Sequence, residues 1–540
     1  MTCLTVARVT GMSASGANSA RQRYRDTVFD SVAPEPGHHQ PPTRTADAVL
    51  IGVLAAVISG AAAGRPSLWF DEAATIAAAA NRSLPELWRM LGHIDAVHGM
   101  YYLFMHGWFA AFPATEFWSR LPSALAVGVG AAGVVVLTEL FCTRLVAVCS
   151  GMLFAVLPRI TWAGIEARPY AFSAMTAAWL TVLCVVAVRR DTLRAWLRYG
   201  LLAVVSTLIS AFSVLVVVSH AVVILVLGNR RSTALHWVAT AGPALMAMTP
   251  FLFFSQTQIG QVNWISPLGW RTATELVEQQ YFDKSVPFAL LSGLVIVAAV
   301  GARRAGLRPP PAGGATQLSV ICAAWILIPT IITLAYSAVV RPVYYPRYLI
   351  GTAPAMAVVL GICVATITTR PWGVVTLMVF FSVATAPNYL VTQRDRHAKE
   401  GWDYSQVADV VKAYALPGDC LVVDNTTGWR PGPIRALLAA RPDAFDSLAD
   451  PGRGPRGPKI GQLWDGHLAV WAVTDRLDQC PTIWTLTNHD PTLPAHQAGD
   501  DLLQGPVFAR TPAGQVLRRL GFRTVERWQF TFTQVIRSAH

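Results

Sequence analysis

Long apolar runs separated by short polar segments fill the chain from residue 46 to residue 390. A membrane-spanning helix needs about 20 mostly apolar residues. Runs close to that length predict spans at 46–63, 120–140, 145–163, 169–188, 233–254, 286–302, 318–340, 348–367 and 371–390. The run 199–228 is too long for one span, and Ser210 and Ser213 in its middle predict a hairpin of two short helices. The pattern therefore predicts a polytopic α-helical membrane protein with about 11 transmembrane helices.

Arginines fall on alternate sides of successive runs, and the positive-inside rule assigns them to the cytoplasm. They are Arg144, Arg189, Arg190, Arg194, Arg198, Arg230, Arg231, Arg303, Arg304, Arg308 and Arg370. The exported side is then predicted to hold 64–119, 164–168, 255–285, 341–347 and everything after 391. The polar, Arg-bearing segment 1–44 is predicted to be a disordered cytoplasmic tail, and the first apolar run an uncleaved signal anchor.

Composition supports a membrane protein. The chain is 53% hydrophobic and 14% charged, whereas soluble domains carry about a quarter charged residues. The formal net charge is +12, but the basic residues lie between apolar runs, as topology signals do. Nucleic-acid binding is therefore not favoured.

The segment 391–540 has no span-length apolar run and is rich in Asp, Gly, Pro and Trp. Its pattern predicts a small α/β domain, with helices near 407–411 and 434–440, strands at 421–423, 468–473 and 482–486, and a closing helix–strand unit at 513–535. Residues 450–459 are predicted to form a flexible loop. On the oxidising side of the membrane, Cys420 and Cys480 either form a disulfide or remain two unpaired buried cysteines.

An acidic pair, Asp71-Glu72, follows Trp69-Phe70 directly after the first span. A carboxylate at the mouth of a span is a candidate general base. The alternative is that Asp71 caps a helix over 72–80 while Glu72 complements its dipole, and both interpretations are compatible. Further along the same loop, His98 is a candidate metal ligand or hydrogen-bond donor, or a plain interfacial histidine.

Other exported turns carry charge as well. Glu166 and Arg168 either line a cavity or pair with each other across their turn. Arg341 and Arg347 lie on the wrong side for topology signals, which favours phosphate binding, since a guanidinium offers several fixed donors. The loop 255–285 is rich in amides and aromatic rings, which suits sugars or a lid without ligand contacts.

Several short motifs occur in a fixed order over about residues 45–390. They are Phe70-Asp71-Glu72-Ala73, Asp95-x-x-His98 followed by Tyr101-Tyr102, Phe117-Trp118-Ser119-Arg120-Leu121-Pro122-Ser123, Ala167-Arg168-Pro169-Tyr170 and Pro346-Arg347-Tyr348-Leu349. Together they resemble the GT-C membrane glycosyltransferases, in particular the branch with protein O-mannosyltransferases and aminoarabinose transferases. The sequence His98-Gly99-Met100 departs from the His-Pro-Pro usual there. No P-loop, dinucleotide-binding glycine pattern, HExxH or serine elbow is present in the sequence.

The resemblance implies a GT-C transmembrane catalytic domain over 45–390, which takes a sugar from a polyprenyl-phosphate carrier and transfers it with inversion on the extracytoplasmic face. Asp71 would be the general base and Glu166 would orient the acceptor. Arg168, Arg347 and Tyr348 would bind the donor phosphate. Contacts to acceptor or sugar would come from Glu72, His98, Tyr101 and Tyr345. No cofactor is implied with certainty, and a divalent metal stays open.

The Ala-, Val- and Arg-rich usage is typical of a high-GC bacterium, and the long exported tail is similar to that of actinobacterial members. The resemblance then implies, in the bacterial plasma membrane, transfer of mannose from polyprenyl-phospho-mannose to an envelope glycolipid or lipoglycan such as lipoarabinomannan, with arabinose as the second choice. A lipid-linked-sugar transporter or flippase would instead show two related halves with broken helices, which the sequence lacks. An envelope scaffold that displays 391–540 is the third alternative.

Overall fold

The computed structural model describes residues 43–540 except 229–230, 308–312, 425–434 and 500–501. The predicted tail, with Cys3, lies outside the described residues up to residue 42. Arg230, Arg308 and Ile434, which entered the sequence predictions, lie outside them too.

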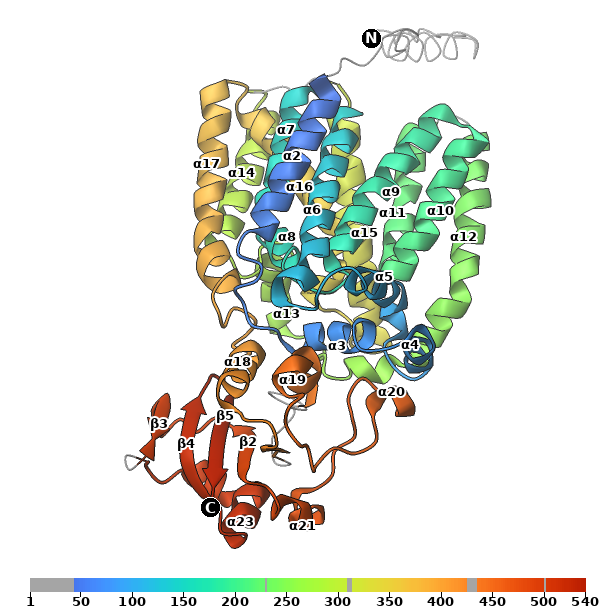
Figure 1. Cartoon of the computed structure of the whole chain (residues 1–540). Coiled ribbons are helices and arrows are strands. Elements are labelled where there is room, and N and C mark those ends of the chain that lie inside the picture. Colours follow the sequence, from blue (N-terminus) through green and yellow to red (C-terminus); the bar gives the residue numbers. More distant parts are fainter. Residues whose placement is uncertain (1–42, 229–230, 308–312, 425–434, 500–501) are drawn as a thin grey trace, which may run out of the picture. The chain divides into compact units, whose positions relative to one another are not determined.

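Each predicted span overlaps a helix (Figure 1). These helices are α2 (Thr43–Gly60), α6 (Glu116–Glu139), α7 (Arg144–Val156), α9 (Tyr170–Arg190), α10 (Leu193–Ile209), α11 (Ser213–Leu227), α12 (Arg231–Thr257), α14 (Val286–Arg304), α15 (Ala315–Val339), α16 (Ala353–Ile367) and α17 (Pro371–Pro387). Within the described part of the chain, seven helical segments are long and apolar enough to cross a membrane, and α2, α7 and α11 are shorter apolar helices. The chain is a multi-pass membrane protein.

Two local features explain where the helices break. The predicted hairpin lies between α10, which ends at Ile209, and α11, which begins at Ser213. The predicted span 145–163 is split into α7 and the short helix α8 (Pro158–Ala163). Pro158 causes this break, because proline disfavours helical geometry in the residue before it, and Leu157 is extended with ψ 121°.

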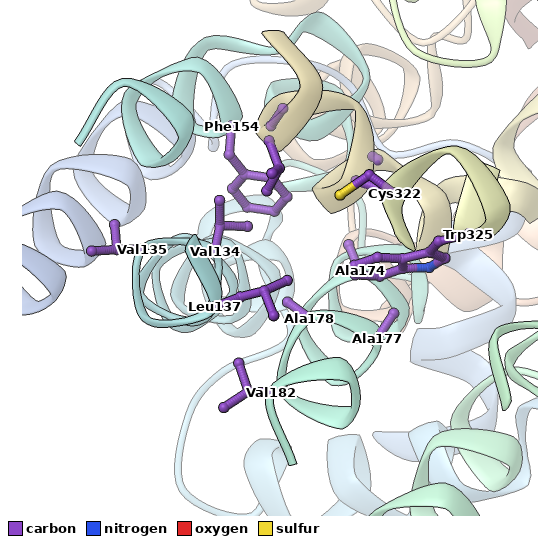
Figure 2. Close-up of a cluster of buried hydrophobic side chains, with 14 of the residues drawn as sticks. Val134, Val135, Leu137, Phe154, Ala174, Ala177, Ala178, Val182, Cys322 and Trp325 are labelled. Atoms are coloured by element: carbon purple, nitrogen blue, oxygen red, sulfur yellow. The ribbon is translucent and has the colours of Figure 1, made fainter. Parts of the chain in front are cut away.

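The membrane helices share one apolar core. Figure 2 shows Val134 and Leu137 of α6, Phe154 of α7, Ala174 of α9 and Trp325 of α15 in one cluster. All five side chains are buried. Large rings alternate with small alanines, so the helices interdigitate closely.

The first loop (residues 64–119) contains α3 (Phe70–Ala79), α4 (Leu84–Leu91) and α5 (Gly99–Phe109). Figure 1 shows these helices at the end of the bundle where α13 (Trp270–Thr274) and the C-terminal elements also lie. The segments that the arginine pattern assigns to one side of the membrane are thus together at one end of the bundle.

The C-terminal domain (residues 391–540) is built on a five-stranded sheet in the order β1-β2-β5-β4-β3. Its strands are β1 (Cys420–Val423), β2 (Thr482–Asn488), β3 (His496–Ala498), β4 (Arg523–Gln529) and β5 (Thr533–Ala539), and only β1–β2 is a parallel pair. Helices α18 (Tyr404–Tyr414), α19 (Arg435–Ala440) and α23 (Pro512–Arg519) accompany it. Cys420 and Cys480 form a disulfide with a Cα–Cα distance of 5.8 Å.

One predicted strand of this domain is wrong. Residues 468–473 contain the 3-10 helix η8 (Val470–Ala472), and α21 (Thr474–Leu477) follows it. Val470, Val473 and Leu477 are all buried in the same apolar cluster. Their spacing of three and four residues puts them on one face of a helical segment, and this spacing outweighs the β propensity of valine.

The C-terminal domain and the first loop share a second apolar core. Leu68, Trp69 and Ile76 of the first loop pack in one cluster with Trp402 and Leu437. Because α3 is covered in this way, its position depends on the C-terminal domain.

Candidate active site

A cavity of about 900 Å³ lies where the first loop, the ends of several membrane helices and the C-terminal domain meet. Asp71, Arg168 and Arg347 lie in its wall, and its apolar side includes Phe212 and Leu252. The cavity thus has charged groups beside an apolar surface that could bind a hydrocarbon chain.

Asp71 occupies the first turn of α3. The helix begins at Phe70 after the extended residue Trp69, so the expectation that Asp71 caps a helix starting at residue 72 is wrong. A carboxylate in the first turn is favourable because it faces the positive end of the helix dipole. Its Oδ2 lies 3.2 Å from Nη2 of Arg347, and the two side chains are 19% and 11% exposed. Asp71 is therefore available to a ligand in the cavity.

Arg347 lies among aromatic rings. It belongs to η5 (Pro346–Thr352), and its guanidinium carbon is 4.8 Å from the ring centre of Tyr345, 5.4 Å from Trp69 and 5.8 Å from Trp264. Ring faces attract a cation and hold it in place. Its buried Nε has no hydrogen-bond partner among the described residues, which leaves a donor for a bound anion.

Arg168 donates a hydrogen bond to the backbone carbonyl of Asp71 at 3.5 Å and belongs to a buried network beside it. It donates hydrogen bonds to Oη of Tyr102 at 2.9 Å and to Nε2 of His98 at 2.8 Å, and Tyr102 donates to Asp95 at 2.6 Å. Since arginine can only donate, His98 accepts through Nε2 and is neutral there. Burial, reinforced by Arg168 and Arg347, holds the pKa of His98 well below its ordinary value.

Glu72 does not line the cavity, which contradicts the expected contact with acceptor or sugar. It is fully buried and accepts hydrogen bonds from Arg120 at 2.7 and 2.5 Å and from the backbone N–H of Ala167 at 3.0 Å. Arg120 also donates to the carbonyls of Ala63 and Ser67. Glu72 thus fixes the path of the first loop.

Glu166 is also buried behind the cavity wall rather than in it. Lys399 forms an ion pair with its Oε1, and Nε1 of Trp69 donates to its Oε2 at 3.0 Å. The alternative that Glu166 and Arg168 pair across their turn is wrong, because each has other partners. Burial raises the pKa of Glu166, and Lys399 opposes that rise. Direct contact between Glu166 and an acceptor is not compatible with this placement.

Of the predicted site tyrosines, some line the cavity and one is buried away from it. Tyr345 and Tyr348 line the cavity. Tyr101 is 2% exposed and packs edge-on against Phe172 at 5.7 Å, so the expected sugar contact of Tyr101 is wrong. The predicted residues that share the cavity are Asp71, His98, Arg168, Tyr345, Arg347 and Tyr348.

No protein-family model matches the chain, and no curated protein sequence matches it either. Among solved structures, ArnT from Cupriavidus metallidurans bound to undecaprenyl phosphate is similar with a TM-score of 0.52 and 12% identity, over 91% of this chain and 97% of that one. The chain has the GT-C fold.

Two further GT-C proteins are similar at lower TM-scores. The arabinofuranosyltransferase AftD from Mycobacteria matches with a TM-score of 0.48 and 15% identity, over 93% of this chain and 40% of AftD. The oligosaccharyltransferase of Archaeoglobus fulgidus matches with a TM-score of 0.43 and 11% identity, over 81% of this chain and 67% of that one. At these identities the likeness concerns the fold.

Several residues of the cavity were not predicted from sequence patterns. Glu400, Trp402, Trp464 and Phe532 line it from the C-terminal domain, and Lys399 reaches Glu166 behind the wall. None of these residues lies in a motif near the first loop. For Lys399, the sequence offers only that it is a lysine in a chain whose basic residues are mostly arginines.

The described residues contain no group of three or more His, Cys, Asp or Glu side chains placed to hold a metal ion. Outside the cavity lining, Glu72 pairs with Arg120 and Glu166 pairs with Lys399. The charged residues that line the cavity are Asp71, Asp95, Arg168, Arg347 and Glu400.

Proposed function

We propose that the chain is an inverting glycosyltransferase that uses a polyprenyl-phosphate-linked sugar as donor. The observation that carries the proposal is the contact between Asp71 and Arg347, 3.2 Å apart in the cavity wall. One group is a base for a hydroxyl, and the other is a cation for a phosphate. Because Asp71 and Arg347 are adjacent, an acceptor hydroxyl on Asp71 and a donor phosphate on Arg347 would lie next to each other.

In the proposed mechanism, Arg347 binds the phosphate of the donor and Arg168 adds a second positive charge. The phosphate then competes for the guanidinium of Arg347, which frees the carboxylate of Asp71. Asp71 takes the proton of an acceptor hydroxyl while its oxygen forms a bond to the anomeric carbon. The bond from that carbon to the phosphate oxygen breaks on the opposite face, and its electron pair leaves with the phosphate. The two arginines stabilise the charge that develops on the phosphate.

The apolar side of the cavity supports a lipid-linked donor. Leu215, Leu252 and Ile332 come from the membrane helices α11, α12 and α15, and Phe212 from the turn before α11, and they line the cavity beside the charged groups. An isoprenoid chain needs such a surface to leave water. The solved ArnT structure contains undecaprenyl phosphate, a lipid of the proposed class.

For the sugar and acceptor we propose mannose and an envelope lipoglycan such as lipoarabinomannan, with arabinose as the alternative sugar. The reaction is proposed to take place on the extracytoplasmic face of a bacterial plasma membrane. His98, Tyr345 and Tyr348 line the cavity; Tyr348 is proposed to bind the donor phosphate, and His98 and Tyr345 to contact the acceptor or the sugar.

Substitutions of the two paired residues test the mechanism separately. With purified protein and polyprenyl-phospho-mannose or polyprenyl-phospho-arabinose, Asp71→Asn is expected to lower kcat about 10²–10⁴-fold with little change in donor KM. Arg347→Ala is expected to raise donor KM as well, because it removes the phosphate partner. In a strain that lacks the gene, Asp71→Asn should fail to restore the glycan profile.

Asp475→Asn is the matched control, since Asp475 is an exposed carboxylate of the C-terminal domain outside the cavity. It should leave both constants unchanged. A normally produced Asp71→Asn protein that restores the wild-type glycan profile would refute the role of Asp71. Unchanged donor turnover by Arg347→Ala would refute the phosphate site.

A further inference from the structure

One wall of the cavity is aromatic and has no part in the chemistry of Asp71 and the arginines. Trp402, Trp464 and Phe532 come from the C-terminal domain, and Phe70 from α3 joins them. The ring centre of Phe70 lies 6.3 Å from Trp402 and 5.5 Å from Trp464, and Trp402 lies 5.8 Å from Phe532. Phe70, Trp464 and Phe532 are only half-buried, so ring surface remains available.

The loop that carries Trp464 is held in place. The segment 450–459, expected to be flexible, pairs back on residues 462–467, with the N–H of Gly454 donating to the carbonyl of Gly466 at 2.8 Å. A side chain at Gly454 would lie 2.8 Å from the backbone of Gly466. Arg82 of the first loop donates to the carbonyl of Leu463 at 3.0 Å. Trp464 is therefore presented by an anchored turn.

A carboxylate two residues before Trp402 lines the same cavity. Glu400 lines the cavity and is exposed, and its φ of 55° is in the left-handed region. Few residues other than glycine adopt that conformation, and where they do the site is often functional. An ionised carboxylate only accepts hydrogen bonds, so Glu400 suits hydroxyl donors.

Aromatic faces beside a hydroxyl acceptor match the chemistry of a sugar. A sugar ring stacks its C–H face on an aromatic ring and points its hydroxyls sideways.

We propose that Phe70, Trp402, Trp464 and Phe532, with Glu400 in the same cavity, form an acceptor subsite that binds the sugar rings of a glycan. Phe70 precedes Asp71 in α3, so a ring stacked on this wall carries its hydroxyls next to the base. The inference rests on the proposed function and assigns acceptor recognition to the C-terminal domain.

Acceptor kinetics test the subsite. The acceptor probe is the water-soluble glycan fraction from the envelope of cells that lack the gene, freed of lipid by alkali and of protein by protease. With labelled polyprenyl-phospho-mannose and polyprenyl-phospho-arabinose as donors, the wild-type protein is expected to label this glycan. Trp464→Ala should raise acceptor KM about tenfold, as loss of a central aromatic contact does, and leave donor KM within about twofold.

Two variants separate recognition from folding. Trp464→Phe keeps an aromatic face and should stay near the wild-type acceptor KM. Trp471→Ala removes a tryptophan that is 62% exposed and outside the cavity in the same domain, and should change neither KM.

Each contrary outcome has a distinct meaning. The subsite is refuted if Trp464→Ala raises donor KM and acceptor KM equally. It is also refuted if label enters only a lipid or a protein fraction supplied in place of the glycan. Either result leaves the glycosyltransferase proposal standing. If the wild-type protein transfers sugar from neither donor to any fraction, the proposed function fails, and the subsite fails with it.

Discussion

Two buried ion pairs support the residues of the cavity from behind. Glu72 pairs with Arg120, and Glu166 pairs with Lys399. Glu166 also accepts a hydrogen bond from the indole N–H of Trp69, and the ring of Trp69 contacts the guanidinium of Arg347. A buried carboxylate that loses its cation is strongly destabilising. These acidic residues therefore act on the site through its scaffold.

Lys399→Met is expected to destabilise the protein by about 3–5 kcal/mol, since it leaves Glu166 buried without its cation. In this variant burial, with the negative charge of Glu72, keeps the pKa of Glu166 above its ordinary value of 4.5. The folded state then binds a proton more tightly than the unfolded state. Stability should be highest below pH 4.5 and fall as pH rises toward the folded-state pKa. Thermal unfolding in detergent across pH measures this.

Lys412→Met is the matched control, because Lys412 pairs with Asp443 at an exposed position. Such surface pairs contribute about 1 kcal/mol or less. Adding Glu166→Gln to Lys399→Met should recover part of the loss, since it removes the unpaired charge. Equal effects of Lys399→Met and Lys412→Met at every pH would show that the buried pair is unimportant.

At the scale of elements, α2 and α6 approach each other closely through glycines. A side chain at Gly128 would lie 2.6 Å from the carbonyl oxygen of Gly52 and 2.9 Å from Ala56. Small residues allow helix backbones to pack closely in membranes, where helix association depends on van der Waals contact. The crossing also matters for the site, because α6 begins with the segment that carries Arg120.

Gly128→Leu is expected to separate α2 from α6 and to destabilise the protein by about 1–3 kcal/mol or more, as overpacking does. The measurement is the melting temperature of the detergent-solubilised protein. Gly293→Leu in α14 is the control, because a side chain there meets nothing within 4 Å. If both variants melt like the wild-type protein, the contact between the two glycines is unimportant for stability.

At the scale of the whole molecule, the cavity is completed only when three distant parts of the chain meet. The first loop supplies Asp71, η5 supplies Arg347, and the C-terminal domain supplies Trp402 and Trp464. The domain is joined to α3 by a common apolar core. Membrane helices, first loop and C-terminal domain therefore form one functional unit.

The arginine pattern predicts a cytoplasmic N-terminus and an exported C-terminus. Alkaline phosphatase fused after His540 is expected to be active, because that enzyme needs the oxidising side, and green fluorescent protein at the same point should be dark. Fusions after Arg190, in a predicted cytoplasmic loop, should give the reverse. Fluorescence and phosphatase activity of whole cells measure both, and the opposite pattern would invert the proposed topology.

Much of the fold was predictable from local pattern. The spans follow from apolar runs of membrane length, and the hairpin around Ser210 follows from a run too long for one helix. The strand predicted at 468–473 was wrong because Val470 and Val473 have a high β propensity but a helical spacing toward their core. In short segments tertiary packing outweighs propensity.

The helical membrane fold and the candidates Asp71, Arg168 and Arg347 could be predicted from local pattern, because they depend on the length of apolar runs and on charge at the ends of spans. Which acidic residues face the cavity depends on tertiary contacts instead. Like Asp71, Glu72 and Glu166 are carboxylates paired with a cation, but their side chains are fully buried, whereas that of Asp71 is 19% exposed. Contacts between distant residues leave no periodic signal, and so the aromatic wall around Trp464 was visible only in the fold.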